Sequence, residues 1–264
     1  PSVLAYARLW FTLPYAFLAV PITTTMFTEL AEMQAEVNTQ GVKRGIVSGT
    51  NQILFFMIPF ALYLMVFALP LVTLYHAGAF TMESVSAIAS YLAVLAVALP
   101  FYGVNTYLQK VYSSVRKMGV FAGFNFVAGG VQIGLTMLAA SGVGDLPFEA
   151  IAAAEAAFYV VADVCLFAYL RRHLGAFGLR STLRALACSL ALGGLGAAAG
   201  AGVLFALQTW AAPLSGSIPQ ALAYVAAGGL ASLFVTFGLA LKLRVPEAAF
   251  LANIAGKVKG KLGR

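Results

Sequence analysis

Three ionisable side chains, Arg8, Glu155 and Asp163, lie inside stretches of sequence that are otherwise apolar. A charge at bilayer depth costs at least about 2.5 kcal/mol on insertion scales, so each residue is a candidate for binding a charged ligand. Glu155 and Asp163 are separated by roughly 80° around one helix and point to a similar side. A structural role for Asp163 stays open, because Arg171 and Arg172 follow within roughly two to three turns and can neutralise it.

Amide side chains form a second group of candidates. Asn105 and Gln109 lie on another apolar stretch, where they can line a cavity or form hydrogen bonds between helices. The predicted substrate-binding residues are therefore Arg8, Glu155, Asp163, Asn105 and Gln109. The sequence shows no nucleophile with its base, no phosphate-binding glycine loop and no paired-carboxylate site. His76 and His173 fall in loops on opposite sides, so we predict no metal site, no cofactor and no enzymatic activity.

The composition indicates which elements must position these residues. Hydrophobic residues make up 61% of the chain and charged residues 9%, and the mean hydropathy is +0.91. In a soluble domain about a quarter of the residues are charged, so most of the surface of this protein must face lipid. Since a spanning helix needs roughly 20 apolar residues, we predict an all-α polytopic membrane protein. The seven predicted spans are approximately 9–27, 53–74, 85–108, 120–140, 150–170, 185–207 and 220–241.

The basic residues indicate the orientation of these spans. Fifteen of the sixteen Lys and Arg residues follow the first, third, fifth or seventh span, and Arg8 is the exception. Basic loops face the cytoplasm, so the net charge of +7 reflects topology and predicts no nucleic-acid partner. The C-terminus is then cytoplasmic. Because the first span must run inward from the outside, we expect further transmembrane helices upstream in the same chain.

Proline and glycine predict local helix geometry. Five prolines lie in or beside the first three spans, where proline removes a helical hydrogen bond and kinks the helix: Pro14, Pro21, Pro59, Pro70 and Pro100. In the sixth span Gly196 and Gly200 form a small-xxx-small pattern that permits close helix contact. The last two spans carry no ionisable residue in their apolar cores, so packing or lipid contact is their expected role.

Three stretches resemble the MurJ/MviN family. The first reads YARL at 6–9 followed by LPYAFLAVP at 13–21, which is similar to the start of that family's eighth helix. The second reads LYHAGAFT at 74–81, similar to the motif after its ninth helix, and the third reads YLRRHLG at 169–175, like the exit of its twelfth helix. With the spacing of the seven spans, the resemblance covers the chain and implies family helices eight to fourteen.

The resemblance implies a function and a division of the chain. Members of this family flip lipid II across the bacterial inner membrane. Lipid II is a peptidoglycan precursor linked to undecaprenyl diphosphate. The family belongs to the exporter superfamily for drugs, oligosaccharide-lipids and polysaccharides. The family works by alternating access between two lobes. Residues 1–184 would belong to the second lobe, 185–241 would supply two additional helices that form a lipid-facing groove, and 242–264 would be a basic cytoplasmic tail. The implied partners are the lipid-linked sugar, membrane lipids and the upstream helices. Arg8 would face the central cavity and bind the diphosphate.

The chain departs from the family pattern in two places. Ala7 stands where the family usually has an acidic residue, and 111–120 lacks the family's Asp and Thr-Pro. Two other functions therefore stay open: a flippase for another polyprenyl-linked glycan, and a non-transporting membrane scaffold for cell-wall enzymes.

Overall fold

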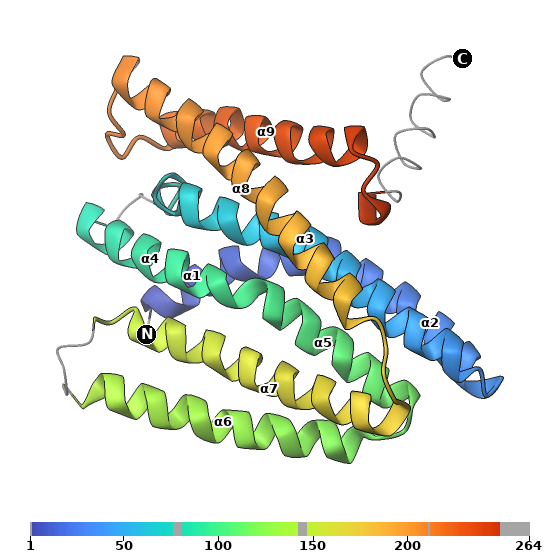
Figure 1. The fold of residues 1–264 in the computed structure, drawn as a ribbon. Coiled ribbons are helices and arrows are strands. Elements are labelled where there is room, and N and C mark those ends of the chain that lie inside the picture. The colour runs from blue at the N-terminus through green and yellow to red at the C-terminus, as the bar shows by residue number, and fades with distance from the viewer. Residues whose placement is uncertain (1, 76–80, 142–146, 211, 249–264) are drawn as a thin grey trace.

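The computed structural model describes the chain except for residues 1, 76–80, 142–146, 211 and 249–264 (Figure 1). The described residues form helices and no strands, and seven helical spans are long and apolar enough to cross a membrane. The prediction of an all-α polytopic membrane protein is confirmed. In order, the elements are α1 (Ser2–Pro14), a π-helical turn (Tyr15–Ala19), α2 (Val20–Ala35), α3 (Thr39–Thr73), α4 (Met82–Leu95), a 3-10 turn (Ala96–Ala98), α5 (Leu99–Ser114), α6 (Met118–Ala140), α7 (Ala150–Leu174), α8 (Leu179–Trp210), α9 (Ile218–Lys242) and a final 3-10 turn (Pro246–Ala248).

Several helices extend beyond the predicted apolar runs. The largest extension is in α3, which begins at Thr39 rather than near residue 53. Its start is capped by Asn38, whose side chain accepts a hydrogen bond from the Gly41 backbone N–H at 2.8 Å. Hydropathy finds only the part of a helix that must lie in hydrocarbon, so it misses polar turns outside that layer.

Successive spans run antiparallel. The α2–α3, α5–α6 and α7–α8 junctions lie at one end of the bundle, on the right of Figure 1, where α9 also ends. The opposite end holds the C-terminal ends of α3, α6 and α8 (Figure 1). The described basic residues that follow the odd-numbered spans therefore share one end, in agreement with the alternation in the sequence.

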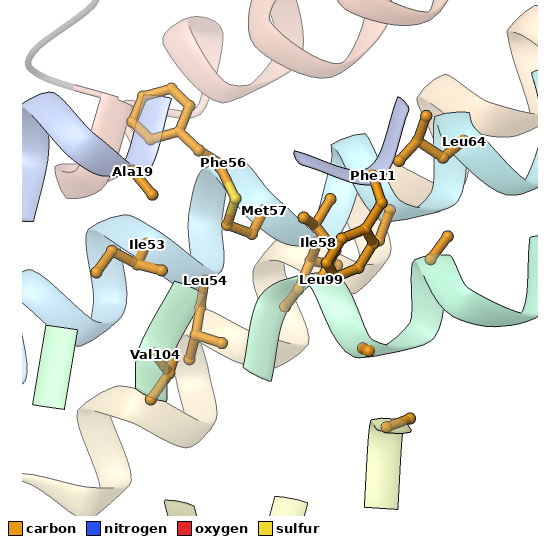
Figure 2. Close-up of a cluster of buried hydrophobic side chains, with 14 of the residues drawn as sticks. Phe11, Ala19, Ile53, Leu54, Phe56, Met57, Ile58, Leu64, Leu99 and Val104 are labelled. Carbon is orange, nitrogen blue, oxygen red and sulfur yellow. The ribbon is translucent and has the colours of Figure 1, made fainter. Parts of the chain in front are cut away.

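Helix α3 is the most buried element and forms the axis of the bundle. In its most apolar window 72% of residues are buried, against 11% for α6. Figure 2 shows Ile53, Met57 and Leu64 of α3 among the side chains of the core, with Phe11 from α1 and Leu99 from α5. Both α1 and α5 are thus held against one central helix, and α7 packs in turn on α5.

Helix irregularities follow only some of the prolines. The π-helical turn begins directly after Pro14, and a 3-10 turn precedes the start of α5 at Leu99 and Pro100. Pro59 and Pro70 lie inside α3 without ending it. Proline is tolerated inside a membrane helix when neighbouring helices pack around the freed backbone groups, and α3 is the most buried helix.

The small-xxx-small pattern in α8 is a site of close contact. A side-chain carbon at Gly200 would lie 2.9 Å from the Gly228 carbonyl oxygen of α9, and one at Gly196 would lie 2.7 Å from the Ser232 carbonyl oxygen. The Tyr63 hydroxyl of α3 donates to that Ser232 carbonyl oxygen at 3.1 Å. Packing is therefore the role that the structure shows for these glycines, as predicted.

Candidate functional site

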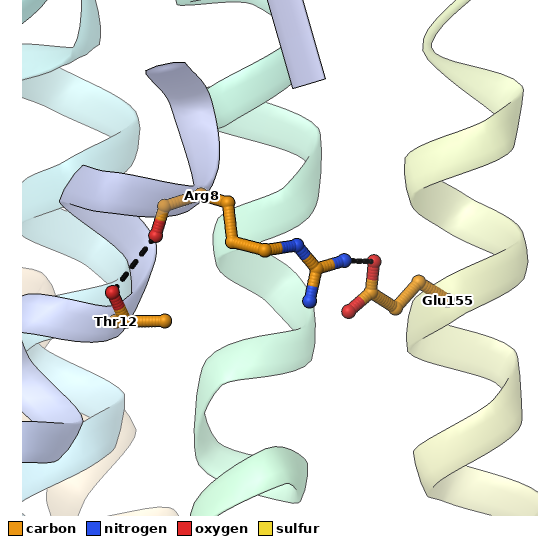
Figure 3. Close-up of polar contacts among 3 residues, drawn as sticks. All are labelled: Arg8, Thr12 and Glu155. Carbon is orange, nitrogen blue, oxygen red and sulfur yellow. Dashed lines mark hydrogen bonds and ion pairs between the residues drawn. The ribbon is translucent and has the colours of Figure 1, made fainter. Parts of the chain in front are cut away.

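Arg8 on α1 and Glu155 on α7 form an ion pair across the bundle. The Arg8 Nη2 donates to Glu155 Oε2 at 2.7 Å (Figure 3). The pair joins two predicted site residues that are far apart in the sequence. It is the only salt bridge within the described residues.

The two partners differ in exposure. The side chain of Arg8 is 53% exposed, whereas that of Glu155 is 7% exposed. A guanidinium carries five N–H donors in a fork, and Arg8 uses one of them on Glu155. The buried carboxylate therefore holds the arginine in place while most of its donors stay available to a second anion. A planar fork of this kind suits the oxygens of a phosphate or diphosphate.

Two tyrosines beside the ion pair, Tyr102 and Tyr159, and a third that packs on Tyr102 were missed by the sequence analysis. Tyr102 of α5 contacts both Tyr15 and Tyr159, with ring centroids 4.6 Å and 5.4 Å apart. Tyr102 and Tyr159 lie close enough to Arg8 and Glu155 to interact with their charges. Helical spacing could have found two of them, since Tyr102 precedes Asn105 by three positions and Tyr159 follows Glu155 by four.

Asp163 and Asn105 form a second pair, between α7 and α5. The Asn105 Nδ2 donates to Asp163 Oδ1 at 2.9 Å, and both residues are buried. Eight residues separate Asp163 from Glu155 on α7, which corresponds to roughly 12 Å along the helix. Four of the five predicted site residues thus form two separate pairs at different levels along α7.

Asp163 also borders an apolar cavity of about 440 Å³ between α3, α5, α7 and α8. Its Oδ2 atom has no hydrogen-bond partner among the described residues, and the same is true of the Oγ1 of Thr50, which also lines the cavity. Arg171 lines this cavity as well, but the structure gives no salt bridge between it and Asp163 within the described residues. The polar partner of Asp163 is therefore Asn105 and not the arginine pair that follows it in the sequence.

Gln109 is separate from both pairs. It lies one turn beyond Asn105 on α5, and its side chain is exposed. In the described part of the chain this side chain forms no hydrogen bond. Within that part there is also no group of three metal-ligating side chains. His76 and most of the 74–81 motif lie outside the described residues, as does the tail from 249 onward.

Comparison with known proteins gives one consistent family. A family model for "Lipid II flippase MurJ" matches residues 1–220. A lipid II flippase MurJ from Thermosipho africanus (strain TCF52B) is 26% identical over 114 residues, which cover 43% of this chain and 23% of the relative. A solved structure, "Lipid II flippase MurJ, inward closed conformation", is 20% identical with a TM-score of 0.65 and covers 92% of this chain.

The match to the solved structure covers 47% of that protein, so the present chain spans about half its length. Its TM-score shows a shared fold across nearly all of the described helices. The family model covers most of the chain, including α1 with Arg8 and α7 with Glu155 and Asp163. The chain therefore belongs to the lipid II flippase MurJ family.

Proposed function

We propose that the protein translocates a lipid-linked oligosaccharide precursor, lipid II for peptidoglycan synthesis, and that Arg8 binds its diphosphate. Family membership supports the activity, and the observation that carries the role of Arg8 is its ion pair with Glu155. A half-exposed guanidinium with four unused N–H donors is a phosphate site held ready by a buried carboxylate. The activity is transport, not catalysis.

Glu155 shares the guanidinium of Arg8 with the substrate. Without a ligand, the carboxylate neutralises Arg8 and avoids the cost of a buried unpaired charge. A diphosphate offers more oxygens and more negative charge than one carboxylate, so it can take over the free donors of Arg8 while Glu155 keeps one. Binding and release then alter how tightly α1 is held to α7.

An apolar groove of about 380 Å³ also supports the proposal, because it suits the lipid tail of the substrate. Helix α9 supplies part of its wall and α8 supplies none, so only the second helix of the groove-forming pair that we propose at 185–241, beside the lobe of 1–184, lines this groove. Trp10 lies two residues from Arg8, so one helix contributes to both the headgroup and the tail sites. The groove is lined mainly by Trp10, Leu13, Phe17, Phe60, Leu64, Val225 and Leu233.

The remaining candidates have supporting roles in this scheme. Asp163 and Asn105 fix α7 against α5 and so keep Glu155 facing Arg8. Gln109 is exposed near the basic end of α5, where an entering headgroup would pass it. That basic end faces the cytoplasm of a bacterial inner membrane, and the tail of 242–264 is cytoplasmic. The other half of the transport path is supplied by upstream helices of the same chain.

Complementation tests the role of Arg8. In the full-length protein, Arg8→Ala alone leaves Glu155 buried and unpaired, so the double variant Arg8→Ala/Glu155→Gln is the cleaner test. We expect this double variant to reach normal membrane abundance and fail to rescue a flippase-depleted strain. Glu155→Gln alone keeps the cation and should rescue at least partly. Rescue by the double variant at normal abundance would show that Arg8 does not bind the substrate.

A further inference from the structure

A cavity of about 510 Å³, lined mostly by polar and charged residues, lies at the basic end of the bundle, between the first turns of α3, the α7–α8 connection and the final 3-10 turn. Lys43 and Arg44 line it, and Glu247 lines it from the 3-10 turn. Neither Arg8 nor Glu155 contributes to this cavity. It is therefore distinct from the site proposed for the substrate.

The two cations in the cavity are not neutralised by protein carboxylates. Within the described residues neither Lys43 nor Arg44 forms an ion pair. The connection comes close to Lys43 at Gly175, where a side-chain carbon would lie 3.4 Å from the Lys43 Nζ and where φ is +83°. Glycine adopts this conformation at little cost, so the backbone can turn beside the lysine without covering it.

Asn51 supplies an independent sign of a missing partner. It is 5% exposed, and its Nδ2 donates to the Ser181 Oγ at 3.1 Å. Its Oδ1 is buried but accepts no hydrogen bond from the described part of the chain, although buried polar atoms nearly always have a partner. Asn51 lines the cavity, so a rotation of its amide can bring this oxygen to a ligand that has a hydroxyl or N–H donor.

The position of the cavity along α3 indicates which ligand is available there. The cavity uses Gln40 to Gln52, the polar turns that precede the apolar part of α3. These turns extend for roughly 18 Å, which places the cavity at the level of lipid headgroups. Lys43, Arg44 and Glu247 together carry a net charge of +1. One phosphate diester would neutralise it.

We propose that this cavity binds the headgroup of a phospholipid from the leaflet at the basic end, and that the headgroup is of the phosphoglycerol type. Lys43 and Arg44 bind the phosphate, since basic pockets at this level attract anionic headgroups. The glycerol hydroxyls donate to Asn51 Oδ1 and to the Glu247 carboxylate. A headgroup without donors, such as phosphocholine, would leave both acceptors unsatisfied.

Native mass spectrometry of the purified full-length protein tests the proposal. The protein is mixed with phosphatidylglycerol, phosphatidylcholine or inorganic phosphate, and the bound lipid is measured for the wild type and for Lys43→Gln/Arg44→Gln. Loss of two basic contacts should weaken phosphatidylglycerol binding about 30-fold. The matched control Arg116→Gln/Lys117→Gln removes the same charge at the same end but outside the cavity, and should retain wild-type binding.

Several results would overturn the proposal. Equal loss of binding in the control pair would indicate a general electrostatic effect. Equal binding of phosphatidylcholine, or of inorganic phosphate alone, would show that the cavity does not recognise a phosphoglycerol lipid. Displacement by a polyprenyl-diphosphate lipid would assign the cavity to the substrate path. A second variant that keeps both cations, Glu247→Gln, should raise binding of the doubly charged phosphatidate relative to phosphatidylglycerol, and an unchanged ratio would also contradict the assignment.

Discussion

Arg8 and Glu155 depend on each other unequally, because one is half exposed and the other is buried. Without Glu155, Arg8 can still reach water or lipid phosphate by extending its long side chain. Glu155 has no cation other than Arg8 in hydrogen-bond contact where the chain is described. Arg8 can therefore contact a ligand while it stays exposed, whereas Glu155 depends on Arg8 to neutralise its buried charge.

This asymmetry predicts an order of stabilities. Arg8→Ala should lower the free energy of unfolding by about 2 kcal/mol, because it leaves a buried acceptor unpaired. Glu155→Gln should cost about 1 kcal/mol or less, because the exposed arginine is solvated. The double variant should be more stable than Arg8→Ala alone. Thermal unfolding of the four proteins in one detergent measures this cycle, and strict additivity of the two single changes would contradict the ion pair.

Asn105 and Asp163 lead to a second prediction. Asn105→Leu should destabilise the protein by about 2 kcal/mol, because it removes the donor to Asp163 and leaves both carboxylate oxygens without partners. Asp163→Asn should cost less, since an amide oxygen can still accept from Asn105. The same unfolding assay compares the two variants. If Asp163→Asn proves the more damaging change, the carboxylate has a partner other than Asn105.

The sequence could identify these residues as special but could not pair them. Charges and amides in apolar runs are visible in the sequence because they are costly in lipid. Arg8 and Glu155 are separated by 147 positions, so their contact depends on how α1 and α7 pack around the bundle. The sequence offered Arg171 and Arg172 as partners that neutralise Asp163, but the side chain that contacts it in the structure is Asn105 of α5.

At the scale of helices, length and packing decide what hydropathy leaves open. The apolar cores of all seven spans were found in the sequence because lipid demands them. The polar first turns of α3 were not found, because they lie outside the apolar run and are stabilised by the Asn38 cap on the Gly41 backbone N–H. Likewise, proline marks where a helix can break, but burial keeps α3 continuous through Pro59 and Pro70.

The α8–α9 contact predicts the effect of enlarging a glycine. Gly200→Val would place carbon against the Ser232 side chain, and its Cβ would lie 2.8 Å from the Phe67 ring, so it should cost about 1–3 kcal/mol. Gly202→Val on the same helix meets nothing within 4 Å and should change stability by less than about 0.5 kcal/mol. Melting temperatures of the two variants measure the difference. Equal melting temperatures would mean that α8 and α9 do not pack as described.

On the scale of the whole molecule, the antiparallel spans place the described basic connections at one end of the bundle. Charge alternation alone predicted this arrangement, because the sides of successive connections must alternate in a chain of spanning helices. The same charges predict the direction of the bundle in the membrane.

Cysteine labelling tests that direction. In a protein lacking Cys165 and Cys188, single cysteines at Thr81, Ser141 and Ser217 should react with an impermeant thiol reagent added to intact cells. Cysteines at Thr39, Ser113 and Ala176 should react only after the cells are opened. All six positions are exposed. The reverse pattern would invert the bundle and place Arg8 near the cytoplasmic face.

Translocation of lipid II is the central claim, and a leaflet assay in cells measures it most directly. The full-length protein is expressed as the sole flippase, and an enzyme added outside digests the lipid II that has reached the outer leaflet. We predict normal digestion with the wild type and strong loss with Arg8→Ala/Glu155→Gln, with the undigested lipid II retained inside. Normal digestion with this variant at equal protein abundance would contradict the role of Arg8, and digestion that persists without the protein would contradict the transport function itself.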